Sequence, residues 1–269
     1  MTTHNVNQGH GMHVVHDGPQ QAPPLLLIHG SGASNRFWSP VVPSLAHRHR
    51  VIRVDLPGHG QSPPATSYDV MEQAARLAAA LDELGLRQVT VAGHSSGGYI
   101  ATALAAQRPD LVTSLTLISS GPSPEALLPQ PALLRVLTAP PLGPLLWPIR
   151  SDAMLRQGMA ATCHRPVSLP DELIADVRGI GYRTLRAVLR ANTAYIADRS
   201  LPDRLTALGL PLLVIFGAAD PRWDPSSAHD YGKVRGARVE QLAEVGHLPM
   251  LEAPETTGEL LLRFAVTVR

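Results

Sequence analysis

Short apolar runs alternate with stretches of helical spacing along most of the chain. Most of these runs carry no charge, which is typical of strands in a sheet that helices cover on both faces. Glycine and proline follow several of them and indicate turns. We therefore expect strands at residues 24–29, 50–55, 88–93, 112–118, 211–217 and 238–242.

Alanine and leucine recur at helical spacing between these runs. The predicted helices span residues 70–85, 99–107, 225–231 and 253–267. Strands that alternate with helices of this length indicate βαβ units. The sequence therefore predicts an α/β fold with a mostly parallel central sheet and helices on both faces.

The pattern changes between residues 122 and 202, where no clear strand occurs and leucine, alanine, arginine and proline are frequent. Helical runs lie near residues 131–138, 151–161 and 171–195. A structureless loop of this length is uncommon inside a compact domain. We therefore expect a helical cap at residues 122–202, inserted into a core domain that residues 1–121 and 203–269 form.

The composition excludes several classes of protein. A chain of 269 residues can bury one large core without stabilising cross-links. Its formal net charge of +1 provides no field that would hold nucleic acid. Cys163 is the single cysteine, which excludes an internal disulfide and a cysteine-based zinc site. Its neighbour His164 does not face it on a helix, so we expect a structural thiol.

Neither a targeting signal nor a membrane span is predicted. The first 18 residues lack the apolar core of a signal peptide. The most apolar stretch, residues 132–149, contains Arg135 and four prolines, which would break a spanning helix. We expect a cytoplasmic protein whose partner is a small-molecule substrate, and the sequence does not determine its oligomeric state.

Four histidines near the N-terminus raise the question of a metal site: His4, His10, His13 and His16. If His13 and His16 share a strand, they point to opposite faces of the sheet. Apart from Asp17, no carboxylate or cysteine accompanies them. We therefore expect neither a metal nor an organic cofactor.

Residues 93–97 (GHSSG) fit the pattern G-x-S-x-G between a predicted strand and a predicted helix. A sharp turn there exposes the central serine in a strained conformation, and small residues on either side relieve the crowding. The N–H of Ser96 then lies at a helix start, where negative charge is favoured. The motif predicts Ser95 as a nucleophile and Ser96 as one backbone donor to an oxyanion.

A second glycine-rich motif, residues 29–32 (HGSG), follows an earlier strand. The second donor of an oxyanion hole usually comes from this loop, and the N–H of Ser31 is our candidate. His29 is more readily explained as a brace of the loop than as a catalytic base.

Two acids follow the predicted strand at residues 211–217. Asp220 lies just past its carboxyl end, where open α/β sheets place ligand groups. Asp224 is the alternative, but it also fits an N-cap for the helix that starts at Pro225. We favour Asp220.

His247 lies in the loop after the predicted strand at residues 238–242. The order Ser95, Asp220, His247 matches the Ser…Asp…His chain order of α/β-hydrolases. The gap between the first two accommodates the cap, and the gap between the last two holds one helix and one strand. These three residues are the predicted catalytic triad.

Five segments carry a resemblance to a known family: HGSG at 29–32, DLPGHGQS at 55–62, GHSSGG at 93–98, GAAD at 217–220 and GHLPMLEAPE at 246–255. In them the chain resembles the α/β-hydrolase fold superfamily, in its branch of small, lidded, cofactor-free serine hydrolases. The resemblance covers almost the whole chain outside the cap. It implies that Asp55 and His59 are scaffold residues, and that Glu252 and Pro254 anchor the last helix.

The resemblance also separates branches of that superfamily. Haloalkane dehalogenases and epoxide hydrolases carry an aspartate where Ser95 stands. Proline iminopeptidases usually have tryptophan at the position of Ser96, and hydrolases of carbon–carbon bonds usually have methionine there. This chain departs from all of these patterns.

Large residues flank the predicted site loops. Aromatic rings there line a pocket or belong to the core, and the sequence leaves both readings open. The cap stretch at residues 127–149 is rich in leucine and proline and would roof an apolar pocket. The candidate pocket residues are Gly30, Phe37, Trp38, Trp223 and Leu248.

Together these features predict a serine hydrolase that cleaves a carboxylic ester, lactone or thioester of a small to medium apolar substrate through an acyl-enzyme. Alternatives on the same triad are a perhydrolase, an acyltransferase and a carbon–carbon bond hydrolase. An alternative of another class is a small-ligand receptor or signalling protein, because function depends on the site and not on the fold.

Overall fold

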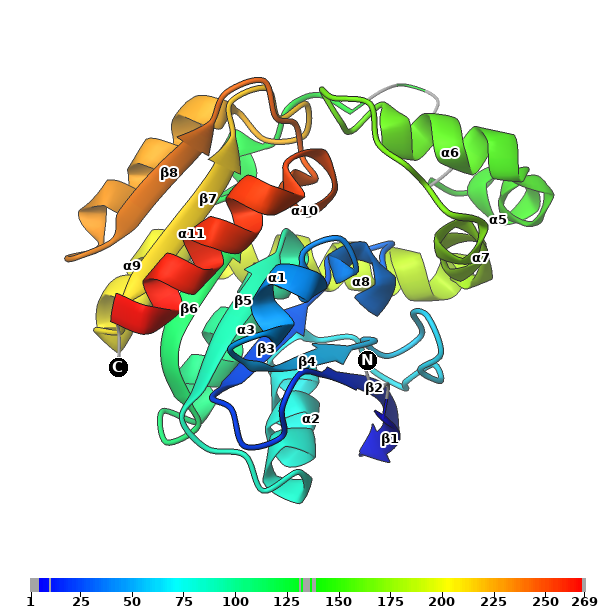
Figure 1. Cartoon of the computed structure of the whole chain (residues 1–269). Helices are drawn as coiled ribbons and strands as arrows, with labels where there is room; N and C mark the ends of the chain where they lie inside the picture. The colour runs from blue at the N-terminus through cyan, green and yellow to red at the C-terminus, as the bar shows by residue number, and fades with distance from the viewer. Residues whose placement is uncertain (1–4, 10, 131, 133–135, 137–138, 268–269) are drawn as a thin grey trace.

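The computed structural model describes residues 5–9, 11–130, 132, 136 and 139–267 (Figure 1). Within them, eight strands form one sheet in the order β1-β2-β4-β3-β5-β6-β7-β8. Neighbouring strands from β4 to β8 are parallel, and β1 and β2 add an antiparallel edge. The strands are β1 (Asn5–Gly9), β2 (Met12–Asp17), β3 (Pro24–Ile28), β4 (Arg50–Val54), β5 (Val89–His94), β6 (Val112–Ile118), β7 (Leu212–Gly217) and β8 (Arg238–Leu242).

This sheet confirms the predicted α/β fold and its mostly parallel strands. The predicted strands correspond to β3 to β8 within a residue or two at each end. The predicted strands included neither β2 nor β1. The five residues of β1, NVNQG, show no strong β pattern and pair only with β2 along an edge of the sheet. That pairing is a tertiary contact that a local pattern does not reveal.

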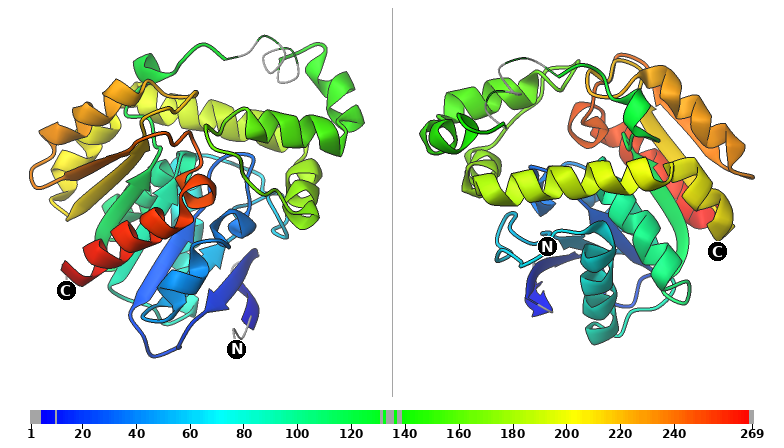
Figure 2. Two further views of the ribbon diagram at one scale, coloured as in Figure 1. Left: turned by 45° about the horizontal axis from the view of Figure 1, so that its top comes forward. Right: turned by 180° about the vertical axis from the view of Figure 1, so that it is seen from behind.

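Helices cover both faces of the sheet, and strand alternation explains why. In β3, Leu26 and Ile28 join the apolar cluster under one helical layer, while Leu25 and Leu27 join the cluster under the other. Successive strand residues point to opposite faces, so a strand buried on both faces is apolar throughout. One layer holds α1 (Val42–Ala46) and α11 (Pro254–Thr267), and the other holds α2 (Val70–Glu83), α3 (Ser96–Gln107) and α9 (Leu201–Leu208) (Figures 1 and 2).

The chain between β6 and β7 is helical and contains no strand among its described residues. Its longest helix, α8, crosses one side of the molecule (Figure 2, right). The predicted helix at 131–138 lies largely outside the described residues, and the limits of the cap at 122 and 202 remain a prediction, since α9 extends across the second. The helices are η2 (Pro124–Ala126), α5 (Gly143–Leu146), η3 (Trp147–Ile149), α6 (Asp152–Ala160), α7 (Asp171–Gly179), α8 (Tyr182–Asp198) and α9.

The predicted helical run at 171–195 is two helices, α7 and α8, separated at Ile180 and Gly181. Both of these residues have extended backbone conformations. The carbonyl of Ile180 accepts a hydrogen bond from the indole N–H of Trp147 at 2.8 Å. A distant partner therefore takes a carbonyl that a continuous helix would use internally.

Asp176 ties helix α7 to the loop that follows β3. Its carboxylate accepts a hydrogen bond from Ser34 Oγ at 2.7 Å and forms an ion pair with Arg36 at 3.1 Å. The phenol of Tyr68 lies 3.0 Å from the hydroxyl of Thr184, which attaches α8 in the same way. These contacts hold α7 and α8 against the loops that follow β3 and β4.

A second attachment centres on the carboxylate of Glu252, at the end of α10 (Pro249–Glu252). One of its oxygens accepts hydrogen bonds from the N–H groups of His164, Arg165 and Gly246, at 2.7, 3.0 and 2.8 Å. The other accepts the N–H of Leu248 at 3.0 Å. The carboxylate therefore joins a segment beyond β6 to the loop after β8, which is more than the helix anchor that the resemblance implied.

That junction requires a glycine at position 246. A Cβ there would lie 2.7 Å from both the N of His164 and the O of Thr162. The carbonyl of Thr162 also accepts the N–H of His247 at 2.8 Å. The backbone of residues 162–164 therefore packs directly against the backbone of Gly246 and His247.

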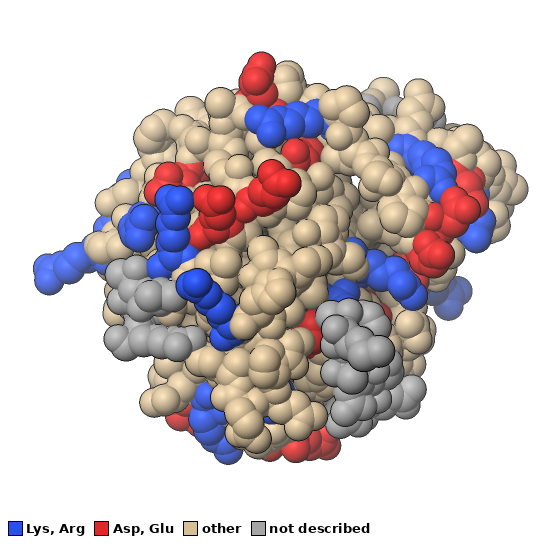
Figure 3. Space-filling view, in the orientation of Figure 1, with Lys and Arg blue, Asp and Glu red and all other residues tan. Residues whose placement is uncertain are grey.

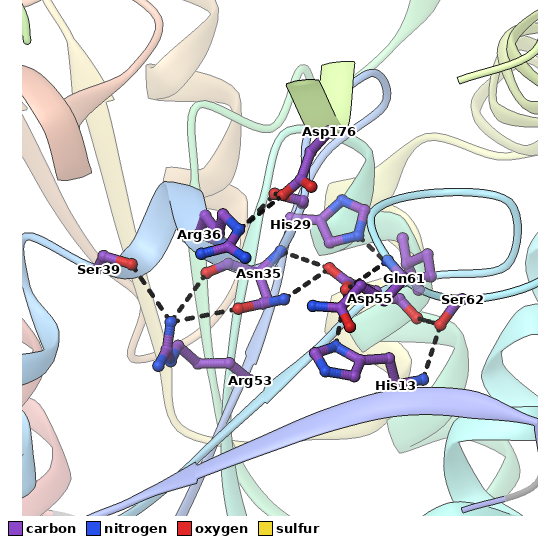
Figure 4. Close-up of polar contacts among 12 residues, drawn as sticks. His13, His29, Asn35, Arg36, Ser39, Arg53, Asp55, Gln61, Ser62 and Asp176 are labelled. Atoms are coloured by element: carbon purple, nitrogen blue, oxygen red, sulfur yellow. Dashed lines mark hydrogen bonds and ion pairs between the residues drawn. The ribbon is translucent and has the colours of Figure 1, made fainter. Parts of the chain in front are cut away.

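A buried polar network joins the loops after β3 and β4 (Figure 4). One oxygen of Asp55 accepts the N–H and the side-chain amide of Asn35, at 2.7 and 2.9 Å. The other accepts the N–H of Gln61 at 3.0 Å and lies 2.9 Å from Nδ1 of His13. Both carboxylate oxygens of this fully buried group are therefore satisfied, as burial of a charge requires.

His29 braces the loop that follows β3. The N–H of Leu56 donates to its Nε2 at 2.9 Å, so the ring proton lies on Nδ1 and is donated to the carbonyl of Gly30 at 2.8 Å. His59 lies 5.2 Å from it, ring centre to ring centre, and is also buried.

Burial has opposite results for the acid and the histidines of this network. It disfavours the charge of Asp55, but hydrogen bonds from His13 and from backbone N–H groups outweigh it and lower the pKa of Asp55 to about 2. Burial lowers the pKa of His59 to about 3 and shifts the pKa of His29 in the same direction. The native fold therefore holds both rings neutral.

Replacing Glu252→Gln should destabilise the fold by about 1–3 kcal/mol, because the amide NH₂ cannot accept the backbone N–H groups that face it. Urea unfolding measures the loss. Glu259→Gln is the control, since that residue is exposed and its described ion pair is with Arg263, one helical turn away. Equal free energies of unfolding for both variants would contradict a structural role for Glu252.

We expect the free energy of unfolding to fall as the pH drops from about 7 to about 4.5. The unfolded chain then binds protons at histidines near their ordinary pKa, whereas native His59 stays neutral. Stability is fully present above about pH 6.5 and is lost below it, by about 1.4 kcal/mol per pH unit for each such histidine. Urea unfolding at several pH values measures this slope.

The variant His59→Gln should reduce the slope of unfolding free energy against pH by about 1.4 kcal/mol per pH unit, because it removes one histidine that the fold holds neutral. The contribution of Asp55 is separate, because its lowered pKa stabilises the fold above about pH 4, and this stabilisation is lost as the pH falls from about 4 to about 2. A stability that is constant or rises on acidification would show that these rings are not held neutral.

Candidate active site

Ser95 occupies a strained turn between β5 and α3. Its φ of 51° and ψ of −121° lie outside the regions that non-glycine residues ordinarily adopt. Glycines on both sides permit this: a Cβ on Gly97 would lie 2.4 Å from the carbonyl oxygen of Ile28, and one on Gly93 would lie 2.4 Å from that of Gly97. The turn places Ser95 at the carboxyl edge of the parallel strands.

Three loops at this edge bring Ser95, His247 and Asp220 together. His247 Nε2 lies 3.2 Å from Ser95 Oγ, and its Nδ1 lies 2.8 Å from Asp220 Oδ2. All three side chains are buried, with Ser95 retaining 7% exposure. Each residue follows a different strand, β5, β7 or β8, so residues 152 positions apart meet at hydrogen-bond distance.

The two candidate acids have different partners. Oδ1 of Asp220 accepts the N–H groups of Arg222 and Trp223, at 2.8 and 3.2 Å, which leaves Oδ2 for His247. Asp224 instead accepts the N–H of Ser226 at 2.9 Å and caps η4 (Pro225–Lys233). The predicted helix at 225–231 is this 3₁₀ helix. Asp224 thus has the capping contact that its alternative reading described.

His94 supports the loop that carries His247. Its Nε2 lies 2.9 Å from the carbonyl oxygen of His247. A carbonyl only accepts, so Nε2 carries the proton. Burial, followed by the proximity of His247, holds the pKa of His94 well below its ordinary value, which keeps the ring neutral.

The two predicted oxyanion donors, the N–H groups of Ser96 and Ser31, differ in their hydrogen bonding. Ser96 begins α3, and its N–H lies in the first turn, where a helix offers no acceptor. The N–H of Ser31, however, donates to Ser96 Oγ at 2.8 Å, and the two hydroxyls are 2.9 Å apart. The side-chain amide of Asn192 also donates to Ser31 Oγ at 2.9 Å. Ser31 is available to a substrate only after the hydroxyl of Ser96 moves.

A cleft of about 450 Å³, including its open mouth, adjoins these groups. Of the predicted pocket residues only Trp223 lines it. Phe37, Trp38 and Leu248 pack in the interior cluster under α1 and α11, and Gly30 is pressed against Ser95. The lining residues are Ser31, Ser95, Ser96, Tyr99, Pro124, Leu127, Leu189, Asn192, Thr193, Ile196, Arg222 and Trp223.

Sequence reasoning missed the contribution of α8 to this cleft. Leu189, Asn192, Thr193 and Ile196 follow the spacing i, i+3, i+4, i+7 and therefore share one helix face. That spacing indicates a packed face, but it does not reveal which surface the face meets. Tyr99 and Arg222 were also missed, although they lie close in sequence to the predicted serine and acid.

Other candidate groups take structural positions. Burial, reinforced by the nearby charge of Glu252, raises the pKa of the Cys163 thiol to about 12, so it is not a ready nucleophile. His13 belongs to the network of Asp55, and His4 and His10 lie outside the described residues. No group of three or more potential metal ligands occurs within the part of the chain that the structure describes.

The surface shows no field of a single sign on the face seen in Figure 3, where basic and acidic side chains are interspersed. This matches the net charge of +1. In the described ranges, none of the helices has the length and hydropathy needed to cross a bilayer.

Comparison with known proteins extends this picture. Among curated relatives, the dihydrolipoyllysine-residue acetyltransferase component of the acetoin cleaving system of Pseudomonas putida is 32% identical over 254 residues, which cover 92% of this chain and 64% of that protein. This chain thus spans less than two thirds of that relative. The pimeloyl-[acyl-carrier protein] methyl ester esterase of Neisseria meningitidis serogroup C is 29% identical over 257 residues, covering 91% of this chain and 94% of that protein.

Solved structures agree with the sequence relatives. The crystal structure of a bacterial membrane phospholipase A superposes with a TM-score of 0.81 at 28% identity, covering 100% of this chain and 87% of that one.

A family model described as the alpha/beta hydrolase family matches residues 25–260. The match includes every strand from β4 to β8 and all three residues of the predicted triad, and the chain belongs to the alpha/beta hydrolase family.

Proposed function

We propose that this chain is a serine hydrolase that cleaves ester-type bonds through an acyl-enzyme. The observation that carries the proposal is the arrangement of Ser95, His247 and Asp220 at the strained turn, with distances of 3.2 and 2.8 Å. The printed names of an esterase and a phospholipase among its relatives and structural neighbours support the same class of reaction.

Acylation begins when Ser95 Oγ attacks the ester carbonyl and passes its proton to His247 Nε2. Asp220 accepts the Nδ1 proton of the ring in a hydrogen bond, which keeps the correct tautomer and stabilises the imidazolium that forms. Two backbone N–H groups of Asp220's own loop occupy its other oxygen, so the carboxylate is held in one orientation.

The developing oxyanion receives the N–H of Ser96 and, once the hydroxyl of Ser96 turns away, the N–H of Ser31. His247 then gives its proton to the leaving alcohol, and the carbonyl reforms as the acyl-enzyme. Water loses a proton to the same ring and attacks the acyl carbon, and the ring then returns that proton to Ser95 Oγ as the acid leaves.

We expect a small to medium substrate. Leu127, Leu189 and Ile196 give the cleft apolar walls, and residues of α8 and of the loop after β7 both line it. These walls suit the apolar portion of an acyl chain or alcohol.

The wild-type protein should hydrolyse p-nitrophenyl esters, tested from acetate to decanoate, with multiple turnovers. Ser95→Ala should lower kcat at least about 1,000-fold, because no other group can form the acyl-enzyme. Release of p-nitrophenol measures the rate, and Ser168→Ala, a change at an exposed serine, should have no effect. Equal rates for Ser95→Ala and wild type would remove Ser95 as the nucleophile. A single burst without turnover would instead favour a receptor or a transferase.

The assignment of the acid has its own test. Asp220→Asn should lower kcat by about 10⁴-fold, because the amide stabilises the wrong tautomer of His247. Asp224→Asn should leave kcat within a few-fold of wild type, since the described hydrogen bonds of the Asp224 carboxylate are with Ser226 at the start of η4. Both are measured on p-nitrophenyl acetate alongside thermal unfolding. Loss of activity in the Asp224 variant alone would reverse the assignment.

A further inference from the structure

The cleft beside Ser95 has one wall whose chemistry the proposed mechanism does not use. Arg222 and Trp223 follow Asp220 on the same loop, and both line the cleft together with Ser95 and Ser96. Hydrolysis of an apolar ester needs no cation in this position. The proposed hydrolysis therefore does not explain why Arg222 lines the cleft.

The Arg222 guanidinium has no hydrogen-bond acceptor and no ion-pair partner within the residues that the structure describes. Its backbone is fully engaged, because its N–H donates to Asp220 and its carbonyl accepts the N–H of Leu128 at 2.9 Å. The guanidinium carbon lies 5.8 Å from the ring centre of Trp223, which is its one described ring contact. By contrast, Arg53 and Arg108 form ion pairs with carboxylates, at 2.8 and 2.6 Å.

Asp220 cannot serve as that partner. One of its oxygens accepts two backbone N–H groups and the other lies 2.8 Å from His247. Burial lowers the pKa of Arg222 from its ordinary value, which records the cost of holding the charge away from water. An arginine stays protonated nonetheless, and the nearby charge of Asp220 favours this without a direct ion pair.

A second unsatisfied donor lies in the same wall. The indole Nε1–H of Trp223 is buried and has no acceptor. The ring of Trp223 packs closely against Gly121, where a Cβ would lie 2.3 Å from the ring. This contact restricts rotation of the ring. Two adjacent residues of the cleft thus carry donors without a described acceptor, one a buried indole N–H and the other a half-buried guanidinium, and buried donors are ordinarily paired.

From these contacts we propose that the cleft binds a substrate carrying a free carboxylate in addition to its ester, with Arg222 as the specificity-determining residue. A planar guanidinium presents parallel N–H groups that match the two oxygens of a carboxylate. The substrate class is the half-ester of a dicarboxylic acid, whose methylene chain lies along the apolar wall of Leu127, Leu189 and Ile196. This deepens the proposed function and rests on it.

The test compares two methyl esters of equal chain length, monomethyl adipate and methyl hexanoate, by titration of the acid released. Wild type should prefer the half-ester in kcat/KM by at least about tenfold. Arg222→Met should reduce that preference by about 10- to 100-fold, and Arg222→Lys should retain part of it. Arg235→Met, a change at an exposed arginine outside the cleft, should alter neither the preference nor the rates.

A parallel loss on both esters in Arg222→Met would overturn the proposal, because it would show that Arg222 acts through Asp220 and not on the substrate. An unchanged preference would overturn it as well. Binding gives a readout that does not depend on hydrolysis: adipate should raise the thermal unfolding temperature of the Ser95→Ala protein, and the rise should disappear when Arg222→Met is added. If wild type hydrolyses no ester, the proposed function fails, while this binding measurement still decides whether the carboxylate site exists.

Discussion

The positive φ of Ser95 is the constraint on which the rest of the site depends. It exists because Gly93 and Gly97 let the turn approach its own helix and the end of β3 more closely than any side chain would allow. The packing of β3 and β5 around it opposes relaxation of this strain. A serine hydroxyl is thereby directed out of the sheet edge, where two other loops can reach it. Backbone contact, more than side-chain chemistry, positions the candidate nucleophile.

Buried carboxylates hold those loops in place. Asp55 ties the loops after β3 and β4 together. Glu252 ties the loop of His247 to the chain around His164, between β6 and β7. Each accepts several backbone N–H groups, so each replaces the water that its charge and those N–H groups would otherwise keep. Removing an acceptor leaves buried donors unpaired, which costs more than the bond itself contributes.

The cleft wall of Arg222 and Trp223 differs from these two carboxylates. Within the described residues, four N–H groups reach Glu252, whereas the indole N–H of Trp223 and the half-buried guanidinium of Arg222 have no acceptor. Proteins tolerate unpaired buried donors mainly where a ligand pairs them. The carboxylates of Asp55 and Glu252 are thus paired without substrate, whereas the cleft has donors that a substrate anion would satisfy.

Local patterns in the chain determined the α/β fold, the turn motif at residues 93–97 and the candidate residues Ser95, Asp220 and His247. They could do so because strand alternation, glycine spacing and chain order are properties of short segments. Tertiary structure alone decided that Phe37 and Trp38 pack in the interior, that α7 and α8 separate at Ile180, and that α8 lines the cleft. Each of these depends on a partner far away in the chain, and a side chain's role is set by the partner that folding brings to it.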